Sequence, residues 1–283
     1  MIEHVSIPRG PYALAGDLHL PDDFDAAALR PAVVLATPGS SVKEQIGANY
    51  ASRLARHGLV ALTFDPSHQG RSGGEPRDLE DPYRRGEDIS YAVDALSAVD
   101  GVDPTRIGGL GICAGGGYAV HTARTDHRIK AIATLDDLAR LRAEEVADGE
   151  PARVNWLPDT LDDAAALGIT DVDTLQAVEF YRESPAYSEY STNRRLRRSD
   201  ALLLGYDALH LVDQLLSQPL QVIVAGRRGS TDQYETGMAL WDMAPNPVDL
   251  LVVDGAGHYE MYSVPRYVDQ AVARLLAFYD EHL

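Results

Sequence analysis

The chain has 283 residues, of which 45% are hydrophobic and 24% charged, and its formal net charge is −18 at pH 7. This length allows one large core with a subdomain, the single cysteine excludes an internal disulfide, and no apolar run reaches the ~20 residues of a membrane helix. Nucleic acids and anionic membranes repel an acidic surface, so neither is an expected partner, and the lack of a signal-like stretch after Met1 predicts a cytoplasmic protein.

The chain begins with two short predicted strands, at residues 5–7 and 14–20. In the second strand two leucines alternate with Asp17 and His19. Alternation of this kind predicts a strand with one face in the core and one face in water.

Apolar runs without alternation then predict buried parallel strands, with helical patterns between them. These strands are residues 32–37, 60–64, 107–110 and 129–134. The helices are a segment with Ile46, Tyr50 and Leu54 that ends before Gly58, residues 87–99, and a segment that starts near Ala114. Such alternation predicts an α/β fold, with a mostly parallel sheet and helices on both faces.

The alternation stops at residues 136–218, which carry acids, aromatic residues and an arginine group without a clear buried strand. We expect this insertion to form a cap or lid over the carboxyl edge of the sheet, and the arginine group to be a solvated helix face. Strands return at 220–225 and 248–253, before a final helix with Pro265 in its first turn. The predicted core is therefore residues 1–135 and 219–283.

A cysteine flanked by glycines lies between a predicted strand and a predicted helix, in the segment Gly111-Ile112-Cys113-Ala114-Gly115. A nucleophile on a sharp strand-to-helix turn needs small residues two positions before and after it, because the strained turn leaves no room for side chains. Cys113 is therefore the candidate nucleophile, and the start of the following helix favours its thiolate. The alternative is a buried structural cysteine.

The candidate base is His258, in a glycine-containing loop directly after the strand at 248–253. In enzymes with this kind of turn the histidine comes last in the chain order of nucleophile, acid and histidine. His68 lies in a polar loop, where buried hydrogen bonding is the expected role. The other histidines lie on helices or outside sheet-edge loops.

Two positions are candidates for an acid that orients His258. Asp232 is the only carboxylate close to the end of the strand at 220–225, and we favour it. The second position is Asp136 or Asp137, directly after the strand before the insertion. A third alternative is a Cys-His dyad in which Ser230 holds the ring.

No cofactor is predicted. No histidine pair has metal-ligand spacing, and one cysteine cannot form a zinc cluster. The three glycines at 115–117 are not followed by the Gly-Lys-Ser/Thr of a phosphate-binding loop.

Three segments carry a family resemblance. They are a Gly-x-Cys-x-Gly-Gly turn (Gly111, Cys113, Gly115, Gly116), a Pro-Gly-x-x-Val-Lys-Glu-Gln segment (Pro38 to Gln45) and a Gln-Gly-x-Ser-Gly-Gly-x-Pro-Arg loop (Gln69 to Arg77). The chain resembles the α/β hydrolases of the dienelactone-hydrolase-like branch, and more closely a bacterial group that carries the last two segments. It departs from similar proteins at Thr37, where histidine is common, and at Ser230, where aspartate is common.

The resemblance implies acyl transfer through a thioester on Cys113, with His258 as base and backbone N–H groups of Ala114 and of Gly39 or Ser40 holding the oxyanion. The expected substrate is a small or medium ester, lactone or thioester. Its apolar acyl part would contact aromatic residues of the cap, namely Trp156, Tyr181 and Tyr187.

Two other classes of function stay open. One is a cyclase, acyltransferase or C–C bond hydrolase of specialised metabolism on the same scaffold. The other is a non-catalytic receptor for a small molecule, since a fold does not fix a function. A small molecule is the expected partner in every case, and the sequence leaves open whether the chain forms a homodimer.

Overall fold

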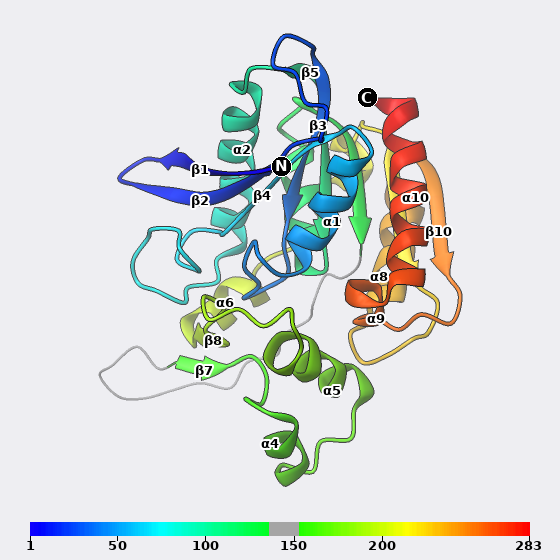
Figure 1. Cartoon of the computed structure of the whole chain (residues 1–283). Helices are drawn as coiled ribbons and strands as arrows, with labels where there is room; N and C mark the ends of the chain where they lie inside the picture. Colours follow the sequence, from blue (N-terminus) through cyan, green and yellow to red (C-terminus); the bar gives the residue numbers. More distant parts are fainter. Residues whose placement is uncertain (136–152) are drawn as a thin grey trace.

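The computed structural model describes residues 1–135 and 153–283, which contain a sheet of eight strands (Figure 1). In spatial order the strands are β1 (Ile2–Arg9), β2 (Tyr12–His19), β4 (Val60–Phe64), β3 (Arg30–Ala36), β5 (Val102–Ile112), β6 (Ile129–Leu135), β9 (Leu220–Ala225) and β10 (Pro247–Val253). β2 pairs antiparallel with both β1 and β4, and every pair from β4 to β10 is parallel. The predicted α/β class with a mostly parallel sheet is confirmed.

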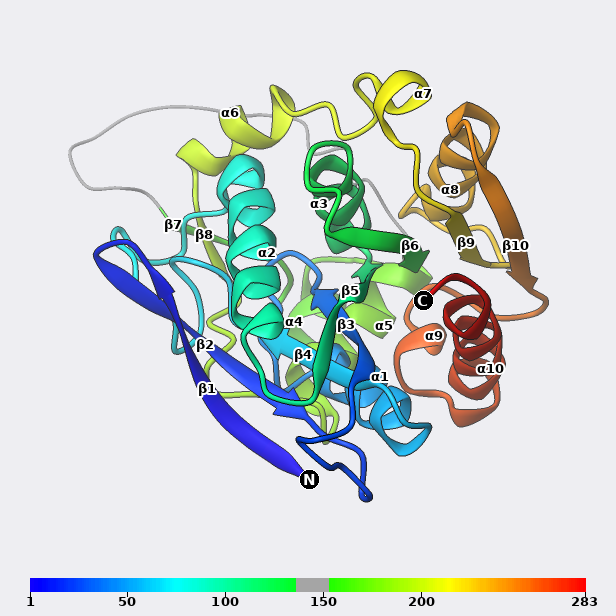
Figure 2. The same ribbon diagram turned by 90° about the horizontal axis from the view of Figure 1, so that it is seen from above.

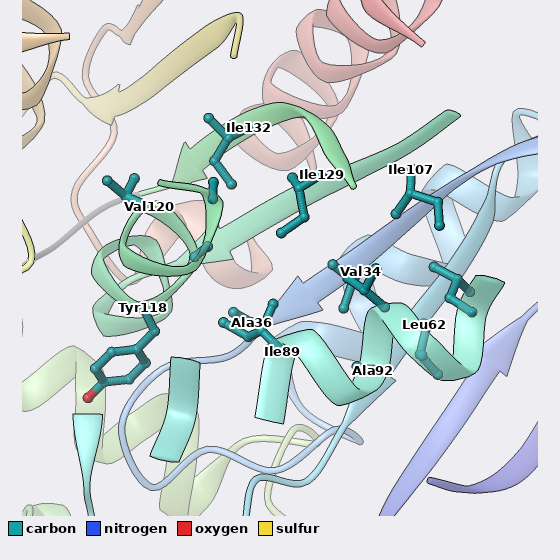
Figure 3. Close-up of a cluster of buried hydrophobic side chains, with 14 of the residues drawn as sticks. Val34, Ala36, Leu62, Ile89, Ala92, Ile107, Tyr118, Val120, Ile129 and Ile132 are labelled. Carbon is teal, nitrogen blue, oxygen red and sulfur yellow. The ribbon is translucent and has the colours of Figure 1, made fainter. Parts of the chain in front are cut away.

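Helices cover both faces of this sheet (Figure 2). One face carries α1 (Ile46–Arg56), α9 (Glu260–Ser263) and α10 (Pro265–His282), and the other carries α2 (Pro82–Ser97), α3 (Ala114–Ala123) and α8 (Gln233–Met243). Figure 3 shows the core on the second face, where Val34 and Ile132 of the sheet lie near Ile89 of α2 and Val120 of α3. Each fully buried side chain of this kind stabilises the fold by about 1.5–3 kcal/mol.

The apolar periodicity of the sequence located α1, α2, α3 and α10, but it placed the start of α2 too late, and α8 and α9 were not predicted. On α1, Ile46, Tyr50 and Leu54 are fully buried, and Gly58 follows the helix with φ +94°. The helix expected at 87–99 begins earlier, at Pro82, because the Asp81 carboxylate accepts hydrogen bonds from the first free N–H groups of α2. A proline at the first helical position was the sequence signal for that start.

The prediction that β2 has one face in water is wrong. Asp17 is 6% exposed and His19 is 2% exposed. The Asp17 carboxylate lies 3.3 Å from the ammonium group of Lys43, which is itself buried, and 2.6 Å from the ring of His4. Alternation could not reveal this arrangement, because the lysine that neutralises Asp17 comes from a distant segment.

Residues 153–218 add short elements that pair with no strand of the eight-stranded sheet. These are β7 (Arg153–Asn155), α4 (Leu161–Ala166), α5 (Val172–Val178), the π-helix η1 (Glu179–Glu183), β8 (Arg194–Leu196), α6 (Arg198–Leu204) and α7 (Val212–Leu215). In Figure 1, α4, α5, α6, β7 and β8 lie together beyond the carboxyl ends of the parallel strands. We use the term cap segment for residues 153–218, and the division into core and cap stays a prediction.

Two further expectations concern the arginine group of the cap segment and membrane-spanning helices. The arginine group falls on β8 and the start of α6, so only part of it lies on a helix, and Arg194, Arg197 and Arg198 are exposed. Within the described ranges, no helix is long and apolar enough to span a lipid bilayer.

Candidate active site

The turn at Cys113 has the strained geometry that its glycines predict. Cys113 lies between β5 and α3 with φ 56° and ψ −132°, a left-handed conformation that non-glycine residues rarely adopt. A Cβ atom on Gly115 would lie 2.2 Å from the Ala36 carbonyl oxygen, and one on Gly111 would lie 2.5 Å from the Gly115 carbonyl oxygen. Only glycine fits at either position, and the half-buried thiol is held at the carboxyl edge of the sheet.

His258 follows β10 and is buried beside the same sheet edge. It is 1% exposed, and Gly255 turns the loop with φ +73°. The hydroxyl of Tyr262, four residues later on α9, lies 2.9 Å from Nε2 of the imidazole. The ring of Tyr259 stands nearly perpendicular to the imidazole, with centroids 4.6 Å apart. These aromatic contacts fix the plane of the ring.

Two buried tyrosine hydroxyls connect His258 to the neighbourhood of Cys113. The hydroxyl of Tyr262 lies close to the Cys113 thiol, and Tyr181 of η1 lies beside Tyr262 and close to Ser41. Burial raises the pKa of both phenols well above their ordinary value, and the nearby Cys113 raises it further, because a thiolate repels a phenolate. Both tyrosines are therefore neutral hydrogen-bond donors at physiological pH.

Backbone donors that could hold an oxyanion come from the loop after β3 and from the start of α3. The N–H groups of Gly39, Ser40 and Ala114 donate to no acceptor in the described part of the chain. Ala114 is the first residue of α3, where helical N–H groups have no acceptor within the helix. The Pro38 carbonyl accepts a 3.0 Å hydrogen bond from Arg85, and a trans peptide then fixes the direction of the Gly39 N–H.

A buried ion pair that the sequence did not reveal supports residues 38–41, the loop after β3, which we call the oxyanion loop. The Arg85 guanidinium donates to the Glu80 carboxylate at 2.8 Å, and Glu80 is fully buried. Tyr118 of α3 donates to the same carboxylate at 2.8 Å, and Gln69 donates to its other oxygen. Burial opposes the charge of Arg85, but Glu80, Tyr118 and Asp88 together outweigh it and the pKa of Arg85 is raised. The only sequence signal was a pair of opposite charges around the start of α2.

The Val-Lys-Glu-Gln segment has a structural role beside this loop. The side chain of Gln45 accepts the Val42 N–H at 3.1 Å and donates to the Ala186 carbonyl of the cap segment at 3.2 Å. The Ser191 hydroxyl of the cap segment also donates to the Ser40 carbonyl. His68 is buried with Nδ1 bonded to the Pro76 carbonyl, which matches its predicted structural role.

Of the three candidate acids, the structure describes only Asp232. Asp232 is exposed, with φ 54° at the start of α8. The residues before it attach to the cap segment, since the Ser230 hydroxyl donates to Asp171 at 2.8 Å and Thr231 donates to Asp173. This exposure weighs against Asp232 as the partner of a buried imidazole. Asp136 and Asp137 lie outside the described residues.

The three predicted substrate-binding aromatics have different environments. The Trp156 indole covers the oxyanion loop, because a Cβ atom on Gly39 would lie 3.3 Å from its Cη2, and the Arg195 guanidinium stacks 4.8 Å from the indole. Tyr181 is buried beside Cys113. Tyr187 is 50% exposed and stacks with Arg182, 5.3 Å from its ring centroid. Trp156 and Tyr181 lie at the site, and Tyr187 faces solvent.

Among the described residues, no group of three or more histidine, cysteine, aspartate or glutamate side chains is arranged to hold a metal ion. A thiol, a buried imidazole and N–H groups without an acceptor are the chemical groups that attack on a carbonyl carbon requires, and these elements bring all of them to the carboxyl edge of the sheet.

Comparison with known proteins shows the family to which the chain belongs. No protein-family model matches the chain. YcjY of Escherichia coli is 34% identical over 302 residues, which cover 96% of this chain and 95% of YcjY. The chain belongs to the YcjY family. PA2218 of Pseudomonas aeruginosa is 31% identical over 95% of this chain and 77% of its own length, and its crystal structure superposes with a TM-score of 0.80.

More distant proteins similar to this member of the YcjY family have named activities. The thiohydrolase aneE of Aspergillus aculeatus is 25% identical over 81% of this chain and 79% of its own length. The polyketide transferase claH of Penicillium crustosum is 24% identical over 81% of each chain. These proteins are named for hydrolysis and for group transfer.

Solved structures identify the fold of the YcjY family. The α/β hydrolase GrgF from a Penicillium species has a TM-score of 0.79 at 19% identity, over 100% of this chain and 99% of GrgF. A dienelactone hydrolase from Anabaena variabilis has a TM-score of 0.57 at 14% identity, over 100% and 98%. The fold is therefore that of the α/β hydrolases, as the sequence motifs predicted.

Proposed function

We propose that the protein is an acyl-transfer hydrolase that cleaves a thioester, lactone or ester through a covalent intermediate on Cys113. The observation that carries the proposal is the left-handed Cys113 at the start of α3, with glycines that no other residue can replace. A cysteine with only a structural role has no use for this strain, which is found where a side chain must be presented for chemistry.

In the first half of the reaction the Cys113 sulfur attacks the carbonyl carbon and its proton passes to His258. The N–H groups of Ala114 and of Gly39 or Ser40 stabilise the oxyanion of the tetrahedral intermediate. His258 then protonates the leaving group, and a thioester on Cys113 remains. In the second half His258 takes a proton from water, which attacks the thioester and restores the thiol.

The relatives support this reaction class. A thiohydrolase and a polyketide transferase differ in whether water or a second nucleophile accepts the acyl group, and both are compatible with one acyl-enzyme. The cap segment contributes Trp156 and Tyr181 to our proposed binding site for the acyl part, while the exposure of Tyr187 gives it no support there.

The experiment is intact-protein mass spectrometry after incubation with short-chain activated esters and thioesters. We expect a single acyl adduct on Cys113 that appears within the first turnover and disappears with hydrolysis. An adduct released only by an added thiol, amine or alcohol would assign a transferase or cyclase instead. Binding without any adduct would contradict the proposal and favour a receptor.

The acid is tested separately by Asp232→Asn, with Asp136→Asn and Asp137→Asn measured beside it. Because Asp232 is exposed, we expect its substitution to change kcat by no more than a few-fold, whereas loss of the acid that orients a catalytic histidine costs about 10⁴-fold. We therefore expect the large loss at Asp136 or Asp137. Asp136 follows Leu135, whose carbonyl accepts the Cys113 N–H at 2.6 Å.

A loss near 10⁴-fold in Asp232→Asn would return the role to the loop after β9. Changes of only a few-fold in all three variants would define a Cys-His dyad. In that case Ser230→Asp becomes informative, because a carboxylate restored there should raise the rate of hydrolysis.

A further inference from the structure

The nitrogen of His258 that the reaction needs is already engaged by a side chain other than the nucleophile. Nε2 lies 2.9 Å from the hydroxyl of Tyr262, and the same side chain lies close to the Cys113 thiol. A neutral imidazole nitrogen has one donor or one acceptor position, so the contact with Tyr262 occupies Nε2. The hydroxyl of Tyr262 therefore stands on the path between sulfur and imidazole.

We propose that Tyr262 relays the thiol proton from Cys113 to His258, so that the reactive unit is Cys113–Tyr262–His258. The inference rests on the proposed function, because it needs Cys113 as nucleophile and His258 as base. It adds Tyr262 to the site. Nothing in the sequence pointed to this residue, which follows His258 by four positions and lies on α9.

The relay moves two protons and leaves the phenol unchanged. As the sulfur forms its bond to the carbonyl carbon, the S–H proton moves to the oxygen of Tyr262. The O–H proton of Tyr262 moves at the same time to Nε2 of His258. The π electrons of the carbonyl move to the oxyanion, and the products are a neutral phenol and an imidazolium that can protonate the leaving group.

The surroundings favour transfer through a neutral phenol over a free phenolate. Tyr262 is 1% exposed, and its ring lies against Phe180, with centroids 5.2 Å apart. Within residues 1–135 and 153–283, the titratable and charged groups that face this hydroxyl and the neighbouring Tyr181 are Cys113, His258, Tyr259 and the guanidinium of Arg85. Burial and the nearby thiol hold the pKa of Tyr262 well above its usual value. Gain and loss of the proton must therefore be concerted.

A second buried phenol packs against the first. Tyr181 lies beside Tyr262 and close to Ser41 of the loop at residues 38–41. The rings of Tyr181 and Tyr262 are nearly perpendicular, with centroids 6.3 Å apart. The cap segment thus reaches the relay through Tyr181.

The test measures the pH dependence of Cys113 alkylation by iodoacetamide, together with kcat/KM for an activated thioester, in Tyr262→Phe. We expect the pH profile of alkylation to move towards that of a free thiol, which is also the change that we expect in His258→Ala. We expect kcat/KM to fall about 10²-fold, a typical loss of acid–base assistance. The matched control is Tyr279→Phe, because Tyr279 is also buried and donates a 2.8 Å hydrogen bond, but to the Gly109 carbonyl. The control should keep the wild-type profile.

The double variant His258→Ala with Tyr262→Phe distinguishes a Tyr262 that acts through His258 from a Tyr262 that acts independently of it. Members of one proton path are not additive, so the double variant should be no slower than His258→Ala alone. Fully additive losses would overturn the relay, and so would a wild-type alkylation profile in Tyr262→Phe.

The unmodified protein gives a measurement that needs no variant to fold. Single-turnover acylation rates in mixtures of H2O and D2O should depend on deuterium content along a curve, because two protons move in one step. A straight line would mean one proton in flight and would overturn the relay. The proposed function fails separately, if Cys113→Ala keeps its activity. An inactive Cys113→Ala with a wild-type Tyr262→Phe leaves that function standing and removes only the relay.

Discussion

Cys113→Ala is expected to lower kcat for an activated thioester by roughly 10⁶-fold, the loss found when the nucleophile of a catalytic triad is removed. The physical reason is that the left-handed turn presents only this side chain, so no neighbouring group can form the acyl-enzyme. The measurement is product release at saturating substrate, with circular dichroism to establish that the variant is folded. Full activity of Cys113→Ala would refute the covalent mechanism.

Cys113→Ser is the matched control for this experiment. It keeps the glycines, the start of α3 and the free N–H groups, and it changes only the atom that attacks. We expect measurable esterase activity above that of Cys113→Ala, because the oxyanion donors alone retain part of the catalysis. Iodoacetamide should inactivate the parent protein and leave the activity of Cys113→Ser unchanged.

The sequence was sufficient to predict the mostly parallel sheet and the strained turn at Cys113. Buried parallel strands read as apolar runs, and the residues of β9 were predicted without error because all six are buried. The turn was predicted because its constraint is local. The crowding around Gly111 and Gly115 comes from the turn itself and from the adjacent strand.

The contacts that shape the site were not predictable, because they join residues far apart in the chain. Tyr181 meets Tyr262 across 81 positions, and Arg85 reaches Pro38 across 47. Each of these side chains has an ordinary explanation in its own segment, as part of an aromatic cap or of a helix. Asp232 is the opposite case, since closeness to a strand end in the sequence suggested a role that its exposure does not support.

The pair of Arg85 and Glu80 provides the second large expected effect. Arg85→Met should lower the free energy of unfolding by about 3–5 kcal/mol, because it leaves the fully buried Glu80 carboxylate without its counter-charge. The donors from Tyr118 and Gln69 remain, but they are neutral. Urea unfolding followed by fluorescence measures the change, and a loss below about 1 kcal/mol would contradict the assignment of a buried pair.

The double variant Glu80→Gln with Arg85→Met separates stability from catalysis. Removing both charges should restore much of the free energy of unfolding, because no isolated charge is then buried and glutamine can still accept the Tyr118 hydrogen bond. The Pro38 carbonyl still lacks the donor that fixes the Gly39 N–H, so kcat should stay about tenfold below that of the parent, less than the 10² to 10³ for an oxyanion donor itself. If activity recovers together with stability, the pair acts on the fold alone. If activity stays low in a stable protein, Arg85 positions the oxyanion loop.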